Sequence, residues 1–208
     1  MQKLIDQLLA TTPLEAAAAV TGLAYLLLAV RRDLLCWLCA FASTILTILT
    51  LVVVAKARLN MQVVLNLFYL GMAVYGFIDW RRGRTDAGDV KIESWSVNQH
   101  AMAAALVIIA SAVNGWILAR WTEAPMPYLD SFVTWGSIVT TWMVARRIIE
   151  NWLYWIVFDG AAVWLYYSQE LLALAALFII YLGIVVRGYI VWRREQVVQQ
   201  AGLAAPSA

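Results

Sequence analysis

The chain has 208 residues, of which 63% are hydrophobic and only 13% are charged, and its mean hydropathy is +0.76. Soluble domains carry about twice that charged fraction, and a net charge of +2 gives no electrostatic support for a nucleic-acid partner. Windows of about 20 apolar residues, enough to span a bilayer core, recur along the sequence. We therefore expect an all-α integral membrane protein.

The first apolar run begins with Thr12-Pro13-Leu14-Glu15, which is typical of a helix start with a capping threonine and a proline in the first turn. The ten residues at the N-terminus hold one lysine and one aspartate rather than a basic flank, so we expect no cleavable signal peptide.

Apolar windows between charged or Pro/Gly breaks predict seven transmembrane helices within a single domain, residues 1–208. The expected ranges are 14–30, 34–55, 61–80, 100–119, 128–145, 148–167 and 171–192. The polar segment 81–99 is too short for a domain and is expected to form a surface loop. Cys36 and Cys39 form a CxxC inside an apolar run, which favours two inert packing thiols over a redox pair.

The distribution of lysine and arginine predicts the orientation, because these residues concentrate on the cytoplasmic side. Eleven fall on one side, at positions 31, 32, 81, 82, 84, 91, 146, 147, 187, 193 and 194, and four on the other, at 3, 56, 58 and 120. The N-terminus is therefore expected outside the cytoplasm and the C-terminus inside, as an odd number of spans requires.

Two segments of the chain repeat each other. YLGMAVYGFIDWRR (69–82) and YLGIVVRGYIVWRR (181–194) are identical at nine of fourteen positions, at an offset of 112. RRDLLCW (31–37) and RRIIENW (146–152) share Arg-Arg and Trp at an offset of 115. Residues 14–80 and 128–192 are thus expected to be two copies of a three-helix unit, joined by the linker helix 100–119.

An odd linker helix makes both copies run in the same direction across the membrane. Parallel repeats of this kind occur in transporters such as the SWEET proteins, where the substrate binds between the repeats near the bilayer midplane. Transport is therefore the leading hypothesis from the repeat alone.

The sixth expected helix carries unusual polar content. Helical spacing places Trp152, Trp155, Asp159 and Tyr166 in one stripe, with Asn151 at its edge. One interpretation is an interfacial tryptophan belt with an aspartate that caps a helix or pairs with an arginine. The other is a substrate site, in which aromatic rings bind a flat or cationic ring and the carboxylate binds charge or hydroxyls.

The first copy has a weaker counterpart of this stripe. Gln62, Asn66 and Tyr69 share a face of the third helix, and the repeat aligns Thr44 with Asp159. Amides in membrane helices also bind neighbouring helices, so the sequence leaves packing and substrate contact open for Gln62 and Asn66.

The stretches VTTWMVARRIIENWLYWIVFDGAAVWLYY (139–167), LFIIYLGIVVRGYIVW (177–192) and NLFYLGMAVYGFIDW (66–80) closely resemble the PnuC-type vitamin transporters of bacteria. The resemblance covers essentially the whole chain. It implies a three-plus-one-plus-three bundle with a SWEET-like architecture, often trimeric. By the family pattern, Trp152, Trp155 and Asp159 line the substrate site together with Asn66.

The resemblance further implies a multi-pass protein of the bacterial inner membrane with a periplasmic N-terminus and a cytoplasmic C-terminus. Typical members carry nicotinamide riboside by facilitated diffusion, and phosphorylation by a cytoplasmic kinase then traps the substrate. Related members carry thiamine or riboflavin. No catalytic residue, metal ligand or cofactor is expected, and the expected partners are the vitamin, the lipid bilayer and further copies of the chain.

Two positions depart from the family pattern. Asn66 stands where many members have glutamine, and Asp159 stands where nicotinamide riboside transporters often have asparagine. An acidic residue beside two tryptophans suits a cationic ring, which nicotinamide riboside and thiamine carry and the neutral riboflavin lacks.

Other classes of function find less support. An intramembrane enzyme has little chemistry available, with one histidine and no HExxH or GxGD motif. A retinal photoreceptor needs a lysine in its last helix, and the lysines here are Lys3, Lys56 and Lys91. A purely structural or assembly role remains the other alternative.

Overall fold

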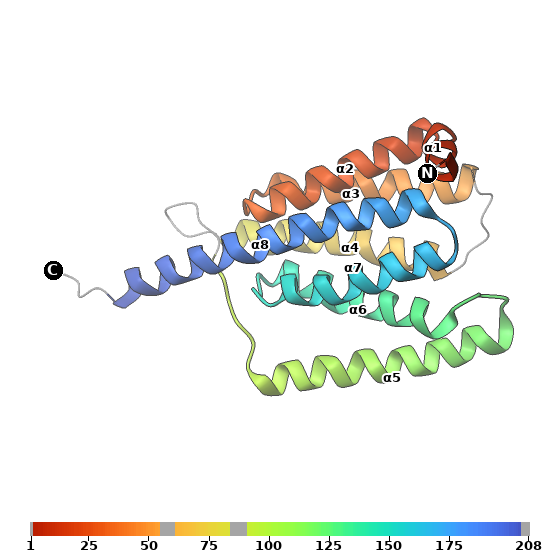
Figure 1. The fold of residues 1–208 in the computed structure, drawn as a ribbon. Coiled ribbons are helices and arrows are strands. Elements are labelled where there is room, and N and C mark those ends of the chain that lie inside the picture. The colour runs from red at the N-terminus through yellow and green to blue at the C-terminus, as the bar shows by residue number, and fades with distance from the viewer. Residues whose placement is uncertain (1, 55–60, 84–90, 205–208) are drawn as a thin grey trace.

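Figure 1 shows the chain as a computed structural model, which describes residues 2–54, 61–83 and 91–204, with the side chains of 53, 54, 61–64 and 202–204 left aside. Eight α-helices and one π-helical turn occur in these ranges. They are α1 (Gln2–Leu9), α2 (Pro13–Val30), α3 (Leu35–Leu49), η1 (Thr50–Val54), α4 (Met61–Arg82), α5 (Val97–Trp121), α6 (Pro127–Ala145), α7 (Asn151–Ser168) and α8 (Leu172–Ala204).

The seven longer helices lie at the positions of the seven expected from the sequence, with different ends. The helix start at Thr12 is confirmed, since its hydroxyl accepts from the Glu15 N–H and the Glu15 carboxylate accepts from the Thr12 N–H. The short helix α1 was not expected, and α8 is longer than expected, with 33 residues. Part of the expected loop 81–99, residues 84–90, lies outside the described residues.

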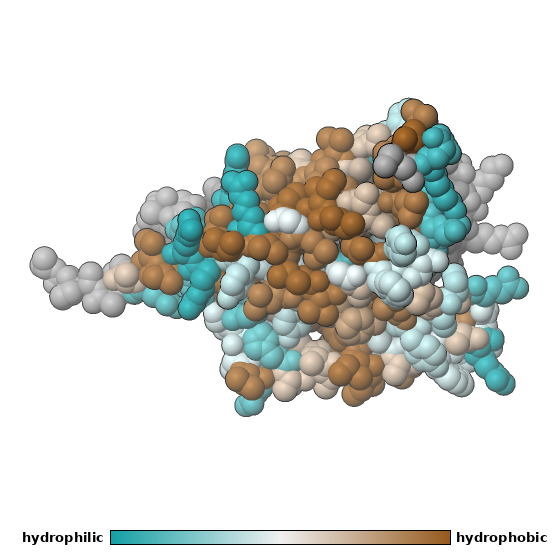
Figure 2. Space-filling view, viewed as in Figure 1, coloured by the Kyte–Doolittle hydropathy of each residue, from teal (hydrophilic) through white to brown (hydrophobic). Residues whose placement is uncertain are grey.

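The helices are those of a multi-pass membrane protein. Four of them, α2, α3 with the start of η1, α5 and α8, are long and apolar enough to cross a bilayer by length and composition. The other three, α4, α6 and α7, bury polar residues that include Asn66, Ser131, Thr140 and Asp159. Figure 2 shows apolar side chains over the middle of the molecule and hydrophilic ones toward both ends, as a bilayer-spanning bundle requires. The two termini lie at opposite ends (Figure 1).

Six helices form a closed ring. In order of contact, α2 packs on α3, α3 on α4, α4 on α6, α6 on α7, α7 on α8, and α8 returns to α2. The contacts between α4 and α6 and between α8 and α2 join the first half of the chain to the second. Each half therefore completes the ring through its last helix.

The linker helix α5 lies outside this ring, against α6 (Figure 1). Its buried stripe consists of Ala103, Val107, Ser111 and Gly115, spaced four residues apart. Small residues at this spacing let two membrane helices approach closely, and the Ser111 hydroxyl donates to the Ser131 carbonyl of α6 at 3.3 Å.

Four fully buried tryptophans form the centre of the core, and we call them the tryptophan tetrad: Trp37, Trp80, Trp192 and Trp152. Trp37 and Trp80 meet edge to face at 5.4 Å between ring centroids, and so do Trp152 and Trp192. A 6.1 Å contact between Trp80 and Trp192 connects the two pairs. The edge-to-face geometry is the favourable one for aromatic quadrupoles, so the tetrad links the two halves by packing.

Hydrogen bonds from the tetrad tie the halves together at the same level. The Trp80 indole N–H lies 3.2 and 3.1 Å from the carbonyls of Val144 and Ala145, at the end of α6. The Trp192 indole N–H donates to the carbonyl of Ala29, near the end of α2, at 3.2 Å. The Ala29 and Val144 carbonyls also accept the N–H groups of Arg32 and Arg147 in the turns that follow, and a carbonyl oxygen has two lone pairs and can accept both bonds.

The turns that follow α2 and α6 are also alike. Arg32 and Arg147 both have a positive φ, of 58° and 60°, and each turn closes with the pair of backbone hydrogen bonds typical of a Schellman helix end. A left-handed conformation costs a non-glycine residue about 1–2 kcal/mol. The arginine side chains reach acids on the closing helices, with Arg32 3.2 Å from Glu195 and Arg147 3.1 Å from Asp79.

The described part of the polar loop docks on the turn between α6 and α7. The Glu93 N–H donates to the Arg147 carbonyl at 3.0 Å, and the Ile149 N–H donates to the Glu93 carbonyl at 2.9 Å. The Gln196 amide of α8 donates to the Ser94 hydroxyl at 2.8 Å. Because Ile149 is engaged by the loop, α7 begins at Asn151 rather than at the expected residue 148.

The short α1 packs at the opposite end of the bundle. The Gln7 side chain donates to the Glu170 carbonyl at 2.7 Å and accepts from the Ala173 N–H at 3.0 Å, which caps the start of α8. Lys3 also hydrogen-bonds the Glu170 carboxylate and thereby holds the pKa of that group below its usual range.

Replacing Gly188 by alanine tests how tightly the tetrad is packed. A Cβ at Gly188 would lie 2.5 Å from the Trp152 ring, which Trp192 holds in place, whereas a Cβ at Gly183 on the same helix meets nothing within 4 Å. We expect Gly188→Ala to destabilise the protein by about 1–3 kcal/mol through overpacking, and Gly183→Ala to be neutral or slightly stabilising. Thermal unfolding of the detergent-solubilised protein measures both, and equal melting temperatures would contradict this packing.

Candidate substrate site

Asp159 is the one charged residue of α7. Its side chain is 4% exposed, and it follows Trp152 by seven residues, which is about 10 Å along the helix axis. Within the described residues, no side chain forms an ion pair or a hydrogen bond with this carboxylate. A carboxylate inside a membrane protein costs several kcal/mol unless it is paired or hydrated, so Asp159 remains the leading candidate for a functional residue on α7.

Four tyrosines from four helices lie within electrostatic reach of Asp159. They are Tyr25 on α2, Tyr69 on α4, Tyr166 on α7 and Tyr181 on α8. All four are half-buried rather than sealed in the core. Each has a hydroxyl that can donate and accept and a ring face that attracts cations, which is the chemistry that the expected site requires.

Two of these tyrosines reach across the ring in the same way. The Tyr69 hydroxyl lies within hydrogen-bonding reach of Ser137 on α6. The Tyr181 hydroxyl lies beside Gly22 on α2, where an added Cβ would be 2.8 Å away. Tyr69 and Tyr181 hold the same place in the repeated YLG motif, so both halves send an aromatic hydroxyl to the same level of the ring.

The structure brings the three expected residues Asp159, Tyr69 and Tyr166 into this cluster. Tyr166 also stacks against Phe178 of α8, with ring centroids 5.2 Å apart. This contact connects α7 to α8, and the roles of the three residues in substrate binding stay predictions.

Two other expected residues, Thr44 and Asn66, are buried inside the first half. Thr44 is 8% exposed on α3 and Asn66 is 4% exposed on α4. Gln62 is the second residue of α4, and its side chain lies outside the described part of the structure. Their roles in substrate binding stay predictions.

Trp152 and Asn151 lie at the tetrad end of α7, away from the tyrosines. Trp152 is 1% exposed and packs between Trp192 and Gly188. Asn151 is fully buried, and its amide donates to the Ile148 carbonyl in the turn that precedes α7. Both residues are packed as structural elements are, and the contact with substrate expected for them stays a prediction.

Trp155 is the expected tryptophan that keeps exposed surface. It is half-buried and packs against the same core cluster as the tetrad. Of the two tryptophans predicted to bind the substrate, it is therefore the one with surface available for a ligand.

Sequence reasoning missed Tyr25, Tyr181 and Ser137. Tyr181 could have been found, because it repeats Tyr69 at the offset of 112. Tyr25 lies in a plain apolar run, and Ser137 is one of several small polar residues of α6, so nothing in the sequence singled out either. The described residues contain no group of three or more side chains suited to a metal ion.

A membrane helix bundle that buries a carboxylate among aromatic hydroxyls is typical of a transporter. The chain belongs to the family described as "Nicotinamide mononucleotide transporter", whose model matches residues 12–194. This family includes the PnuC-type transporters that the sequence resembles, so the resemblance is confirmed.

Two curated relatives are transporters of different vitamins. The riboflavin/roseoflavin transporter RibM of Streptomyces davaonensis is 27% identical over 177 residues, which cover 83% of this chain and 81% of RibM. The nicotinamide riboside transporter PnuC of Neisseria mucosa is 29% identical over 152 residues, 66% of this chain and 56% of that relative.

A solved structure shares the fold. The crystal structure of the vitamin B3 transporter PnuC superposes with a TM-score of 0.73 at 24% identity, over 94% of this chain and 88% of that one. At this identity the likeness establishes the architecture of the helices rather than the substrate.

Truncating the two tryptophans of α7 separates binding from packing. Trp155→Ala should weaken the binding of a cationic vitamin by about 1–2 kcal/mol, the size of a desolvated cation–π contact, and should lower the melting temperature less than Trp152→Ala does, because Trp155 is only half-buried. Trp152→Ala should lower the melting temperature strongly, because removing a buried tryptophan costs about 3–5 kcal/mol. Ligand titration and thermal unfolding of each purified variant measure this, and unchanged affinity in Trp155→Ala would remove it from the site.

Proposed function

We propose that this protein carries nicotinamide riboside across the bacterial inner membrane. The observation that supports this most directly is the buried carboxylate of Asp159 within a group of four tyrosines. Nicotinamide riboside combines a flat cationic ring with sugar hydroxyls. The carboxylate and the ring faces suit the cation, and the tyrosine hydroxyls suit the sugar.

Thiamine is the alternative that the same chemistry supports, because it also carries a cationic ring. Riboflavin is the third candidate. Its ring is neutral and gains nothing from the charge on Asp159, yet the RibM relative covers more of this chain than the PnuC relative does. The dependence of binding on the charge of Asp159 therefore distinguishes the two cationic vitamins from riboflavin.

The proposed topology has seven spans, with α2–α4 and α6–α8 as two parallel copies joined by α5 in a SWEET-like 3+1+3 arrangement. Three pairs of matched contacts support it. The indole hydrogen bonds of Trp80 and Trp192 each reach the end of the other half's first helix, Tyr69 and Tyr181 cross the ring alike, and the turns after α2 and α6 share a left-handed arginine.

The orientation and coupling follow from charge and from the ligand. The excess of Lys and Arg at the tetrad end supports a cytoplasmic C-terminus and a periplasmic N-terminus. The described residues offer no cluster of acidic ligands for a driving cation, and we propose facilitated diffusion, with phosphorylation by a cytoplasmic kinase as the trap. Assembly as a trimer is part of the same proposal.

Neutralising Asp159 tests the charge argument. Asp159→Asn keeps the shape of the side chain and should weaken nicotinamide riboside or thiamine binding by about 1.5–3 kcal/mol, the value of a charge-assisted contact. Riboflavin binding should change by less than about 1 kcal/mol. Titration of the detergent-purified protein with the three vitamins, followed by tryptophan fluorescence, measures this. Equal losses for all three would reject an ionic role for Asp159.

Reconstituted protein tests the transport mechanism. Liposomes that contain the protein should equilibrate labelled nicotinamide riboside or thiamine without a proton or sodium gradient, and Asp159→Asn should slow that exchange. Protein-free liposomes control for leakage. Uptake that requires an imposed gradient would contradict facilitated diffusion.

A further inference from the structure

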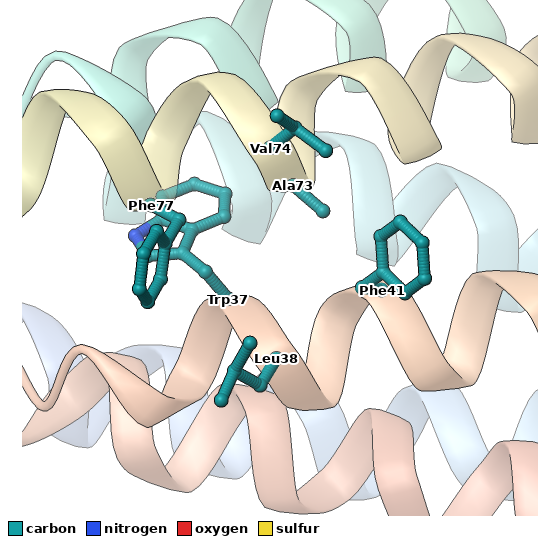
Figure 3. Close-up of a pocket in the computed structure, with 6 residues that line it drawn as sticks. All are labelled: Trp37, Leu38, Phe41, Ala73, Val74 and Phe77. Carbon is teal, nitrogen blue, oxygen red and sulfur yellow. The ribbon is translucent and has the colours of Figure 1, made fainter.

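An apolar groove runs along the outer surface of the bundle between α3 and α4. It has a volume of about 250 Å³ and is lined by Trp37, Leu38, Phe41, Ala73, Val74 and Phe77. Figure 3 shows Trp37 and Phe77 together at one end of the space between the two helices and Phe41 at the other. Leu38, Phe41 and Val74 are exposed, so the groove opens to the surroundings of the bundle.

A second hollow continues the groove toward the tetrad end of α4. It has a volume of about 400 Å³ and is lined by Phe77, Ile78, Arg81 and Arg82. Phe77 lines both hollows. From Ala73 to Arg81 the helix advances eight residues, which is about 12 Å. An apolar channel of roughly that length thus ends at two arginines.

The two arginines at this end of the channel carry exposed positive charge. Arg81 and Arg82 are exposed, and neither forms an ion pair within the part of the chain that the structure describes. The acid on the same helix, Asp79, is already engaged by Arg146 at 3.3 Å and Arg147 at 3.1 Å. The two guanidinium groups are therefore available to an anion.

The matched surface of the second half differs in shape. Val185 stands at the position of Ala73 and is fully buried, so two additional methyl groups fill the corresponding space beside Trp152. The charges are nevertheless the same, because Arg193 and Arg194 match Arg81 and Arg82. The first half thus has an apolar groove beside two arginines. The second half has the matching arginines, but the larger Val185 replaces Ala73.

We propose that the α3–α4 groove binds one anionic phospholipid of the bilayer. An acyl chain lies along the apolar side chains, and the phosphate binds Arg81 and Arg82. Guanidinium groups match phosphate oxygens in charge and geometry, and the groove runs over the apolar middle of a membrane-spanning helix while the arginines stand at its end. A second copy of the chain would have to bring both an apolar ridge and an acidic group to the same place.

The charge part of the proposal is tested with lipids that share their acyl chains. Mass spectrometry of the intact detergent-purified protein, titrated with dioleoyl phosphatidylglycerol or dioleoyl phosphatidylcholine, counts the bound lipids. Wild type should bind phosphatidylglycerol more tightly. The pair Arg81→Gln/Arg82→Gln should lose about 30-fold in affinity, from two arginines at the membrane surface, whereas Arg193→Gln/Arg194→Gln, the matched control, should retain it.

The groove itself is tested by filling it. Val74→Trp places a large side chain in the groove and should reduce the binding of both lipids. Val186→Trp is the control, since Val186 matches Val74 in the repeat and is equally exposed, 47% against 48%. Because Val74→Trp keeps both arginines, it separates the acyl-chain contact from the phosphate contact.

Three results would overturn the proposal. Equal losses in the two arginine pairs would reduce the effect to surface charge, and unchanged lipid binding in Val74→Trp would remove the groove. A change of oligomeric mass in Val74→Trp, with no change in the number of lipids, would assign the groove to a second copy of the chain. Melting temperatures confirm that each variant is folded, and the arginine and groove variants test the site independently.

Discussion

Two buried indole N–H groups, those of Trp80 and Trp192, find acceptors in the opposite half of the chain, and the closed ring of helices depends on these bonds. The indole N–H groups of Trp37 and Trp152 have no hydrogen-bond partner within the described residues. Most backbone carbonyls of a membrane helix are already bonded within it, so the acceptors that remain are at helix ends. Trp80 uses the end of α6 and Trp192 uses the end of α2. Each bond joins one half of the chain to the other, and the close stack of the tetrad holds both bonds in place.

These ties have a consequence for the proposed transport. The fully buried large side chains concentrate around the tetrad, and Asp159 lies about 10 Å further along α7. A vitamin that moves between Asp159 and the tetrad end must pass this closed layer. The ties between α4 and α6 and between α8 and α2 are therefore the contacts that must loosen when that side opens, whereas contacts within each half can stay intact.

The helices were largely predictable because apolar length and the breaks between helices are local properties of the sequence. The exceptions depended on distant contacts. Ile148 and Ile149 look like the start of a helix, but Ile149 pairs with Glu93 across the polar loop and α7 begins later. The short α1 carries few residues, and its Gln7 is held by the start of α8.

The site was harder to predict than the fold, because helical spacing shows which residues share a face but not at which level of the bundle each of them lies. Spacing placed Trp152 and Asp159 in one stripe correctly, but a stripe crosses several levels of the bundle. The structure puts Trp152 in the tetrad and Asp159 among tyrosines from other helices. Which residues of α2 and α8 meet that level depends on the closure of the ring, and no local pattern in the sequence encodes it.

The matched positions of the two halves divide into two groups. Tryptophans, glycines and arginines at the tetrad end are the same in both, as in Trp37 with Gly76 and Trp152 with Gly188. At the level of Asp159 Tyr69 and Tyr181 still match, but other positions differ, since Thr44 matches Asp159 and Gly22 matches Ser137. A duplicated framework needs identical packing residues to close the ring twice, but a single asymmetric vitamin cannot use two identical walls. Divergence at this level therefore supports the proposed substrate site between the halves, in which the second half supplies the carboxylate.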